Sequence, residues 1–225
     1  MTKNGMSPRS QMKEHWEKVY REKQPHEVSW WQDSPKTSLA FIHSLNPLKT
    51  AQIIDVGGGD SRLVDCLVDE GFVNITVLDI SERAIERAKL RLGDKAQRVQ
   101  WVVSDVNDFQ CQKPYDVWHD RATFHFLTDE ASINTYVSVA RRSIKPGGYL
   151  ILGTFSDHGP AKCSGLTVHQ YNESTLTSEL SDGFDRVGCI TEDHITPFKT
   201  KQNFLFCSFR RHLSESIRIL IQAFA

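Results

Sequence analysis

The feature that most constrains this chain is a run from an apolar strand into three consecutive glycines. It reads IIDVGGGDSR at residues 53–62, and Leu63, Val64 and Leu67 follow it with helical spacing. The pattern predicts a strand, a tight turn and a helix. Glycine lets a ligand lie against the backbone, and a helix start presents free N–H groups and a positive dipole end. We therefore expect this turn to hold a ligand.

An acidic residue at the end of the next predicted strand indicates a nucleoside ligand. The strand ITVLDI at residues 75–80 places Asp79 22 residues after Gly57. At such a position a carboxylate accepts hydrogen bonds from the two hydroxyls of a ribose. Arg62 stands where a dinucleotide fingerprint has its third glycine. Asp55, before the glycines, would repel a phosphate and suits a cationic ligand.

The alternation of strands and helices predicts the fold class. Further elements are expected at residues 81–92, 99–106, 115–120, 132–142 and 145–155. This order is typical of an α/β, doubly wound and mainly parallel sheet. Two β-rich runs near the end, FDRVGCITEDHI and NFLFCSFRR, are joined by a connection too short for a crossover helix. We expect these two strands to pair antiparallel.

The pattern D-x-G-x-G at residues 55–59, followed by Asp79, resembles the class I S-adenosylmethionine methyltransferases. The resemblance implies a Rossmann-like, seven-stranded sheet closed by a terminal antiparallel strand pair, with S-adenosylmethionine as cofactor. We assign the methyltransferase domain to residues 51–210, a helical and aromatic lid segment to residues 1–50, and an amphipathic helix to residues 211–225.

The same resemblance implies roles for individual cofactor-binding residues. Asp55 is the acid of the motif, Gly57 and Gly59 face the methionine part of the cofactor, and the backbone around His119 meets the methionine ammonium. Asp79 holds the ribose hydroxyls. Asp105 accepts a hydrogen bond from the adenine amine, and Ile80 and Val106 flank the adenine ring. Two N-terminal aromatic residues, Trp16 and Trp30, are expected to cover the cofactor or the acceptor. The alternative is that they cover an edge of the sheet.

The segment HDRATFHFL at residues 119–127 follows the fourth strand, where such enzymes meet their acceptor. The stretch from the glycines to Asp79 resembles methyltransferase-like protein lysine methyltransferases, but His125 replaces the acid that those enzymes carry near the lysine. We consider His125 and Asp120 as catalytic candidates; a core histidine bonded to the main chain is the alternative reading. The insert at residues 156–172 is similar to acceptor-side loops of thiol and thiopurine methyltransferases, and its Cys163 and His158 are acceptor-contact candidates.

Composition limits the partners. The formal net charge is −1 and the sequence pI about 6.8, which argues against a nucleic-acid partner. The five cysteines form no C-x-x-C pair, so we expect neither a metal site nor a disulfide. The sequence shows no apolar leader or membrane span, which predicts a cytoplasmic protein, as a monomer or homodimer.

The sequence thus predicts an enzyme that transfers a methyl group from S-adenosylmethionine to a small-molecule acceptor by in-line displacement. Methylation of a protein lysine or amine is the enzymatic alternative. A cofactor-binding scaffold without turnover and an NAD-dependent enzyme are the alternatives from other classes.

Overall fold

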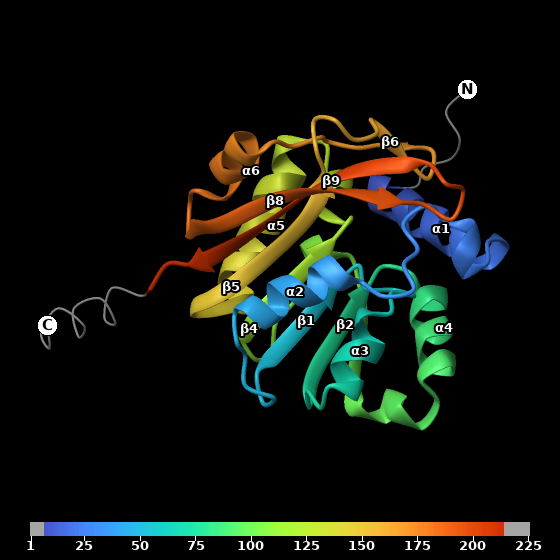
Figure 1. Cartoon of the computed structure of the whole chain (residues 1–225), viewed down its shortest axis with the longest axis horizontal. Coiled ribbons are helices and arrows are strands. Elements are labelled where there is room, and N and C mark those ends of the chain that lie inside the picture. The colour runs from blue at the N-terminus through green and yellow to red at the C-terminus, as the bar shows by residue number, and fades with distance from the viewer. Residues whose placement is uncertain (1–6, 214–225) are drawn as a thin grey trace, which may run out of the picture.

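The computed structural model describes residues 7–213, and its centre is a seven-stranded sheet with helices on both faces (Figure 1). The strands lie in the order β3-β2-β1-β4-β5-β9-β8. Neighbours from β3 to β5 pair parallel, and β9 runs antiparallel to both β5 and β8. The strands are β1 Gln52–Val56, β2 Asn74–Asp79, β3 Val99–Val103, β4 Tyr115–Arg121, β5 Ile144–Phe155, β8 Phe184–Ile195 and β9 Lys201–Arg211. The predicted fold class and the antiparallel pair are confirmed.

In the part of the chain that the structure describes, six α-helices accompany the sheet, and polar side chains cap the N-termini of several of them. Ser81, Asp129 and Asn172 each accept a hydrogen bond from a backbone N–H three residues later. Single turns of 3-10 helix at η3 Val106–Asp108 and η4 Phe124–Phe126 follow two of the strands. The helices are α1 Pro8–Glu22, α2 Lys36–Ser44, α3 Leu63–Asp69, α4 Glu82–Leu92, α5 Glu130–Ser143 and α6 Glu173–Leu180.

The two halves of the core lie on opposite faces of the sheet because strand side chains alternate. Ile53 is fully buried in the cluster with Leu63 of α3, and Ile54 in the cluster with Tyr136 of α5. In Figure 1, α2 and α3 accordingly lie on one side of the sheet and α5 on the other. Burial on both faces explains why the central strands read as continuous apolar runs.

This arrangement brings the acidic ends of neighbouring strands together. Asp55 and Asp79 lie within the last residues of β1 and β2, and Asp120 lies near the end of β4. The third strand is shorter than predicted because Asp105 caps η3, with its Oδ1 accepting from the Asn107 N–H at 2.9 Å. Parallel strands bring their carboxyl ends to one edge of the sheet, where an open α/β sheet holds its ligand.

The insert after β5 forms a two-stranded hairpin, β6 Lys162–Cys163 and β7 Leu166–Thr167. Ser164 and Gly165 make its turn, both with positive φ. The backbone of His169 donates to His125 O at 2.8 Å, which anchors the returning chain over η4. The hairpin therefore lies beside the segment that follows β4.

One prediction was wrong: Cys189 of β8 and Cys207 of β9 form a disulfide. They are 18 residues apart in sequence, but the antiparallel register places them directly opposite, with Cα atoms 4.1 Å apart. Sequence spacing alone did not reveal this pairing because it depends on the register of the hairpin.

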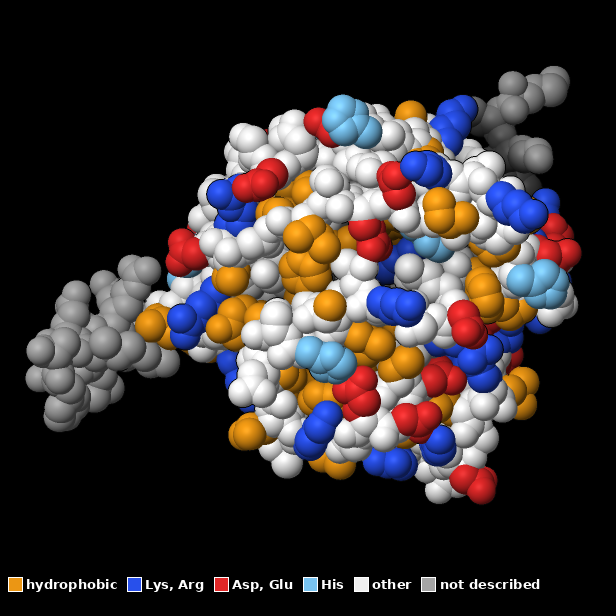
Figure 2. Space-filling model, in the orientation of Figure 1, with side chains coloured by type: hydrophobic (Ala, Val, Ile, Leu, Met, Phe, Trp, Pro, Cys, Tyr) orange, Lys and Arg blue, Asp and Glu red, His pale blue; other side chains and the backbone are white. Residues whose placement is uncertain are grey.

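The surface of the molecule carries charges of both signs. Figure 2 shows acidic and basic side chains interspersed across the visible face, as the near-neutral composition predicts. Between residues 7 and 213 no group of side chains is arranged to hold a metal, and no helix there is long and apolar enough to cross a bilayer. The C-terminal helix predicted for residues 211–225 falls mostly outside the described residues, and its first position, Arg211, belongs to β9.

Candidate active site

The glycine turn after β1 has a backbone that only glycine accommodates. Gly57 has φ +63°, and a Cβ there would lie 1.7 Å from Thr123 Oγ1. Gly59 has φ +37°, and a Cβ there would lie 2.6 Å from Asp79 Oδ2. The N–H of Gly57 donates to Leu78 O at 2.7 Å, which ties the turn to the end of β2. The backbone of the turn thus lies directly against the ends of β2 and β4.

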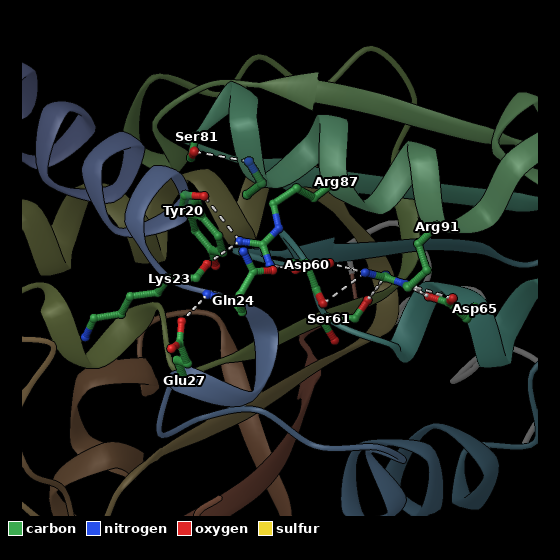
Figure 3. A network of polar contacts seen from close by, with 11 residues as sticks. Tyr20, Lys23, Gln24, Glu27, Asp60, Ser61, Asp65, Ser81, Arg87 and Arg91 are labelled. Atoms are coloured by element: carbon green, nitrogen blue, oxygen red, sulfur yellow. Dashed lines mark hydrogen bonds and ion pairs between the residues drawn. The ribbon is translucent and has the colours of Figure 1, made fainter.

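Two arginines of α4 hold this turn and the N-terminal helix in place (Figure 3). Arg87 and Arg91 both pair with Asp60, directly after the glycines. Arg87 also donates to the carbonyls of Tyr20 and Lys23, at 3.2 Å and 2.8 Å. These carbonyls belong to the C-terminal end of α1, where a cation is favoured by the helix dipole. One helix therefore positions both the glycine turn and the aromatic residues of α1.

A cavity of about 840 Å³, counted with the space open at its mouth, lies at the carboxyl ends of β1, β2, β3 and β4. Its wall is aromatic: the ring of Trp16 lies 5.6 Å from that of Trp30 and 5.1 Å from that of Phe126, between centroids. This placement favours the lid interpretation of Trp16 and Trp30 over the sheet-edge alternative. The cavity is lined by Met12, Trp16, Tyr20, Trp30, Val56, Gly57, Leu78, Asp79, Ile80, Ser104, Asp105, Val106, Arg121, Ala122, Thr123, Phe126, Leu127 and Cys163.

One end of this cavity carries the acids expected to hold an adenosine. Asp79 is 6% exposed, and its Oδ1 accepts from the Ser81 N–H at 2.8 Å. Burial raises the pKa of Asp79 to about 7, and the charge of Asp55 adds to this effect. Ile80, Asp105 and Val106, which follow β2 and β3, line the same cavity. Two carboxylates beside apolar side chains can bind ribose hydroxyls and an exocyclic amine.

A buried pair, Asp55 and His119, faces a second cavity that shares Tyr20, Trp30, Gly57 and Arg121 with the first. The Nδ1–H of His119 donates to Asp55 Oδ1 at 2.7 Å, and both side chains are almost fully buried. Asp55 Oδ2 and His119 Nε2 have no hydrogen-bond partner within residues 7–213. A buried carboxylate oxygen without a partner suits a cationic group such as the methionine ammonium of S-adenosylmethionine. The cavity residues therefore fit this cofactor.

The two catalytic candidates do not line either cavity. Asp120 is buried under the turn after β4, where Oδ1 accepts from the N–H groups of Thr123 and Phe124, at 2.9 Å and 3.3 Å. Burial raises its pKa to about 6. Its hydrogen bonds show a role in shaping the turn, and its position does not support a catalytic one.

His125 lies in the core, as the alternative reading held. It is fully buried, and its Nδ1 accepts from the Phe155 N–H at 3.2 Å. Burial, together with the charge of Arg121, lowers the pKa of His125 to about 3. Its neighbour Phe126 faces the cavity instead. The position of His125 does not support its proposed action as a general base.

Sequence reasoning did not single out several residues that line the cavity. Arg121 is one of them. It follows His119 and Asp120 at the end of the same strand, and this position in the sequence could have indicated that it lines the site. Cys163 was one of two candidates in the insert; it is buried and lines the cavity, whereas the His158 side chain is 86% exposed. Gly59 lines neither cavity, although its φ shapes the turn.

Comparison with known proteins identifies the domain. Residues 53–148 match the family described as "Methyltransferase domain". The ubiquinone biosynthesis O-methyltransferase of Thiobacillus denitrificans is 25% identical over 140 residues, which cover 56% of this chain and 58% of that protein. The chain therefore spans little more than half the length of this curated relative.

Solved structures share the fold over most of the chain. The N-methyltransferase NodS of Bradyrhizobium japonicum in complex with S-adenosylhomocysteine superposes with a TM-score of 0.67 and 19% identity, over 88% of this chain and 98% of that one. The 1,6-didemethyltoxoflavin-N1-methyltransferase of Burkholderia thailandensis has a TM-score of 0.69 and 17% identity, over 94% and 93%. Residues 53–148 thus match a methyltransferase domain, and the solved structures show that the chain has the fold of the class I methyltransferases.

Proposed function

We propose that this protein transfers a methyl group from S-adenosylmethionine to a small-molecule acceptor by in-line displacement. The observation that carries the proposal is one cavity with two chemically different ends. Asp79 and Asp105 lie at the ends of β2 and β3 on one side of β1, whereas Arg121, Phe126 and Cys163 belong to β4 and to segments that follow β4 and β5, on the other side of β1. An adenosine at the acidic end leaves the second end for an acceptor.

S-adenosylmethionine supplies, when bound, an electrophilic methyl carbon on a sulfonium whose leaving group is a neutral thioether. An acceptor lone pair forms a bond to this carbon as the carbon–sulfur bond breaks and its electron pair passes to sulfur. Any proton displaced from the acceptor passes to water. The chain contributes positioning: the glycine turn, Asp79 and the aromatic wall hold the reactants and exclude solvent. In-line positioning can supply up to about 7 to 11 kcal/mol.

The walls of the acceptor end favour a small molecule. Trp30, Phe126 and Cys163 of the β6–β7 hairpin line the cavity near Arg121 with apolar or neutral surface. Relatives named for ubiquinone biosynthesis and for toxoflavin are consistent with an acceptor of this size. His125, which replaces the acid expected beside a lysine, does not reach the cavity.

The first test is calorimetric titration of the protein with S-adenosylmethionine, S-adenosylhomocysteine and NAD. We expect binding of the first two and not of NAD. Radiolabelled methyl transfer to a panel of small acceptors and to cell-extract proteins then separates the acceptor classes. Label found only in protein would replace our proposal with the protein-acceptor alternative. Cofactor binding with no transfer to either panel would favour the inactive scaffold.

A further inference from the structure

Among the described residues 7–213, Arg121 is the only cationic side chain that lines the main cavity. It is partly buried at the end of β4, and its Nη1 donates to the Trp30 carbonyl at 3.0 Å. The centre of its guanidinium lies 4.7 Å from the centroid of the Phe204 ring in β9. These two contacts fix the side chain between the N-terminal loop and the sheet.

The guanidinium has hydrogen-bonding capacity that the described part of the chain does not use. Neither Nε nor Nη2 of Arg121 has a hydrogen-bond partner there, although both atoms are buried. No carboxylate of residues 7–213 forms an ion pair with it; Glu192 acts on its charge from farther away and does not line the cavity. Burial lowers the pKa of Arg121 to about 10, so the group remains cationic at neutral pH. A buried cation with unpaired N–H groups is costly unless an anion or a water completes it.

The surroundings of Arg121 define what could complete it. Trp30 and Phe126 offer aromatic surfaces. Burial raises the pKa of the Cys163 thiol to about 11, so this side chain is neutral and adds no competing charge. The acids Asp79 and Asp105 lie at the adenosine end. The acceptor end therefore combines one cation with apolar, aromatic walls.

We infer that Arg121 is a specificity-determining residue that binds an oxyanion, such as a carboxylate, carried by an aromatic acceptor. This inference rests on the proposed function. The methionine part of the cofactor also carries a carboxylate, and this group is the second possible ligand of Arg121. Arg121 lines the second cavity as well, beside the Asp55–His119 pair. The acceptor is favoured because the second cavity also has Arg62, whereas among residues 7–213 the main cavity has no cation besides Arg121.

Benzoate and its neutral counterpart benzamide are suitable probes, titrated into protein saturated with S-adenosylhomocysteine. We expect the wild type to bind benzoate at least about tenfold more tightly than benzamide, the lower end for a charge-assisted hydrogen bond. Arg121→Met should abolish this preference, and Arg121→Lys should retain part of it. Arg210→Gln, at an exposed arginine on β9, is the matched control and should behave as the wild type.

The cofactor arm uses S-adenosylhomocysteine and 5′-methylthioadenosine, which lacks the methionine carboxylate. Both affinities should stay within about threefold in the Arg121 variants, which also shows that the variants fold. Loss of affinity for S-adenosylhomocysteine alone would assign the guanidinium to the methionine carboxylate and overturn our inference. Equal or absent binding of benzoate and benzamide by the wild type would overturn it as well. Failure of the proposed function would appear separately, as a wild type that binds neither nucleoside.

Discussion

The hydroxyl of Tyr136 donates a hydrogen bond to Asp120 Oδ2 at 2.6 Å, and both side chains are completely buried. The same hydroxyl accepts from Trp118 Nε1 at 3.0 Å. Since Asp120 also caps the turn of Thr123, this chain of bonds links α5 to the floor of the cavity. Asp120 thus supports the site from below without facing it.

Tyr136→Phe should lower the free energy of unfolding by about 1 to 3 kcal/mol, because it leaves a buried carboxylate oxygen without its donor. The loss should be larger at pH 8 than at pH 5, since the folded-state pKa of Asp120 is about 6 and the bond favours the ionised form. Urea unfolding at both pH values measures the loss. Tyr149→Phe is the control, at a partly buried tyrosine whose hydroxyl donates to no carboxylate within residues 7–213. Equal losses in the two variants would contradict the prediction.

Titration of Asp120 in the wild type has a defined sign. Its folded-state pKa lies above the usual 3.8, so the folded state binds more protons between these values. The stability it contributes is fully present below pH 3.8 and is lost as the pH rises through about 6. Asp120→Asn should remove this part of the pH dependence, as measured by unfolding curves between pH 4 and pH 7.

Chemical labelling tests the disulfide between Cys189 and Cys207. Alkylation of the denatured, unreduced protein should modify only Cys66, Cys111 and Cys163, and prior reduction should expose all five cysteines. Reduction should also destabilise the protein by up to about 3 kcal/mol, the scale for closing a loop of this length. Mass spectrometry counts the labels. Five labels without reduction would show that the thiols are free.

The parts of the site that the sequence predicted depend on local rules. The glycine turn and Asp79 could be located because an apolar strand, glycines and an acid have fixed positions in a parallel α/β unit. The parallel sheet could be predicted because segments with a strand-like apolar pattern alternate along the chain with segments that have a helix-like apolar pattern. The disulfide could not be predicted because it depends on the pairing register of β8 with β9, which shifts between Arg186 and Gly188.

The residues around the acceptor end show where sequence reasoning stops. In η4, neighbouring side chains point in different directions, so one faces the core and the next faces the cavity. Phe126 lines the cavity, whereas the adjacent His125 is buried in the core. Arg121 packs on Phe204, which lies 83 residues later in the sequence. A charged residue at a strand end is common, so only the tertiary structure distinguishes this one.

Gly57→Ala should destabilise the protein and weaken cofactor binding, because its Cβ would overlap Thr123 Oγ1 and its φ is positive. Gly71→Ala is a matched control: its φ is +87°, but a Cβ there meets no atom within 4 Å. The control isolates the backbone strain, about 1 to 2 kcal/mol, and Gly57→Ala should exceed it clearly in urea unfolding. Adding Thr123→Ala should recover part of the difference. Equal costs at the two glycines would show that the turn relaxes freely.

Arg87→Met should weaken the affinity for S-adenosylhomocysteine, because it removes the donor that holds the C-terminal end of α1. Loss of these charge-assisted bonds should reduce affinity by about fivefold to twentyfold. Hydrogen exchange across residues 8–22 should become faster in the same variant. The control is Arg83→Met on the same helix, where the side chain is half exposed and reaches Glu17 at 3.7 Å. Unchanged hydrogen exchange in the Arg87 variant would show that Arg87 does not stabilise α1.

Asp79 should give cofactor binding a pH dependence. An ionised carboxylate is the better acceptor for two ribose hydroxyls, and burial raises the pKa of Asp79 to about 7. Below that pH, binding must first remove a proton, so affinity should fall by up to about tenfold per pH unit between pH 7 and pH 6. 5′-Methylthioadenosine is the suitable ligand because it carries the ribose and no group that titrates in this range.

Asp79→Asn should bind 5′-methylthioadenosine about 10-fold to 100-fold more weakly at pH 8 and show no pH dependence, because the amide carries no titrating group. Asp69→Asn, at an exposed acid that pairs with Lys95, should keep both the affinity and the pH dependence of the wild type. Calorimetry at pH 6, 7 and 8 distinguishes these cases. A wild-type affinity that stays constant over this range would mean that the ribose is not held by an ionised Asp79, and the adenosine would then have to be placed elsewhere in the cavity.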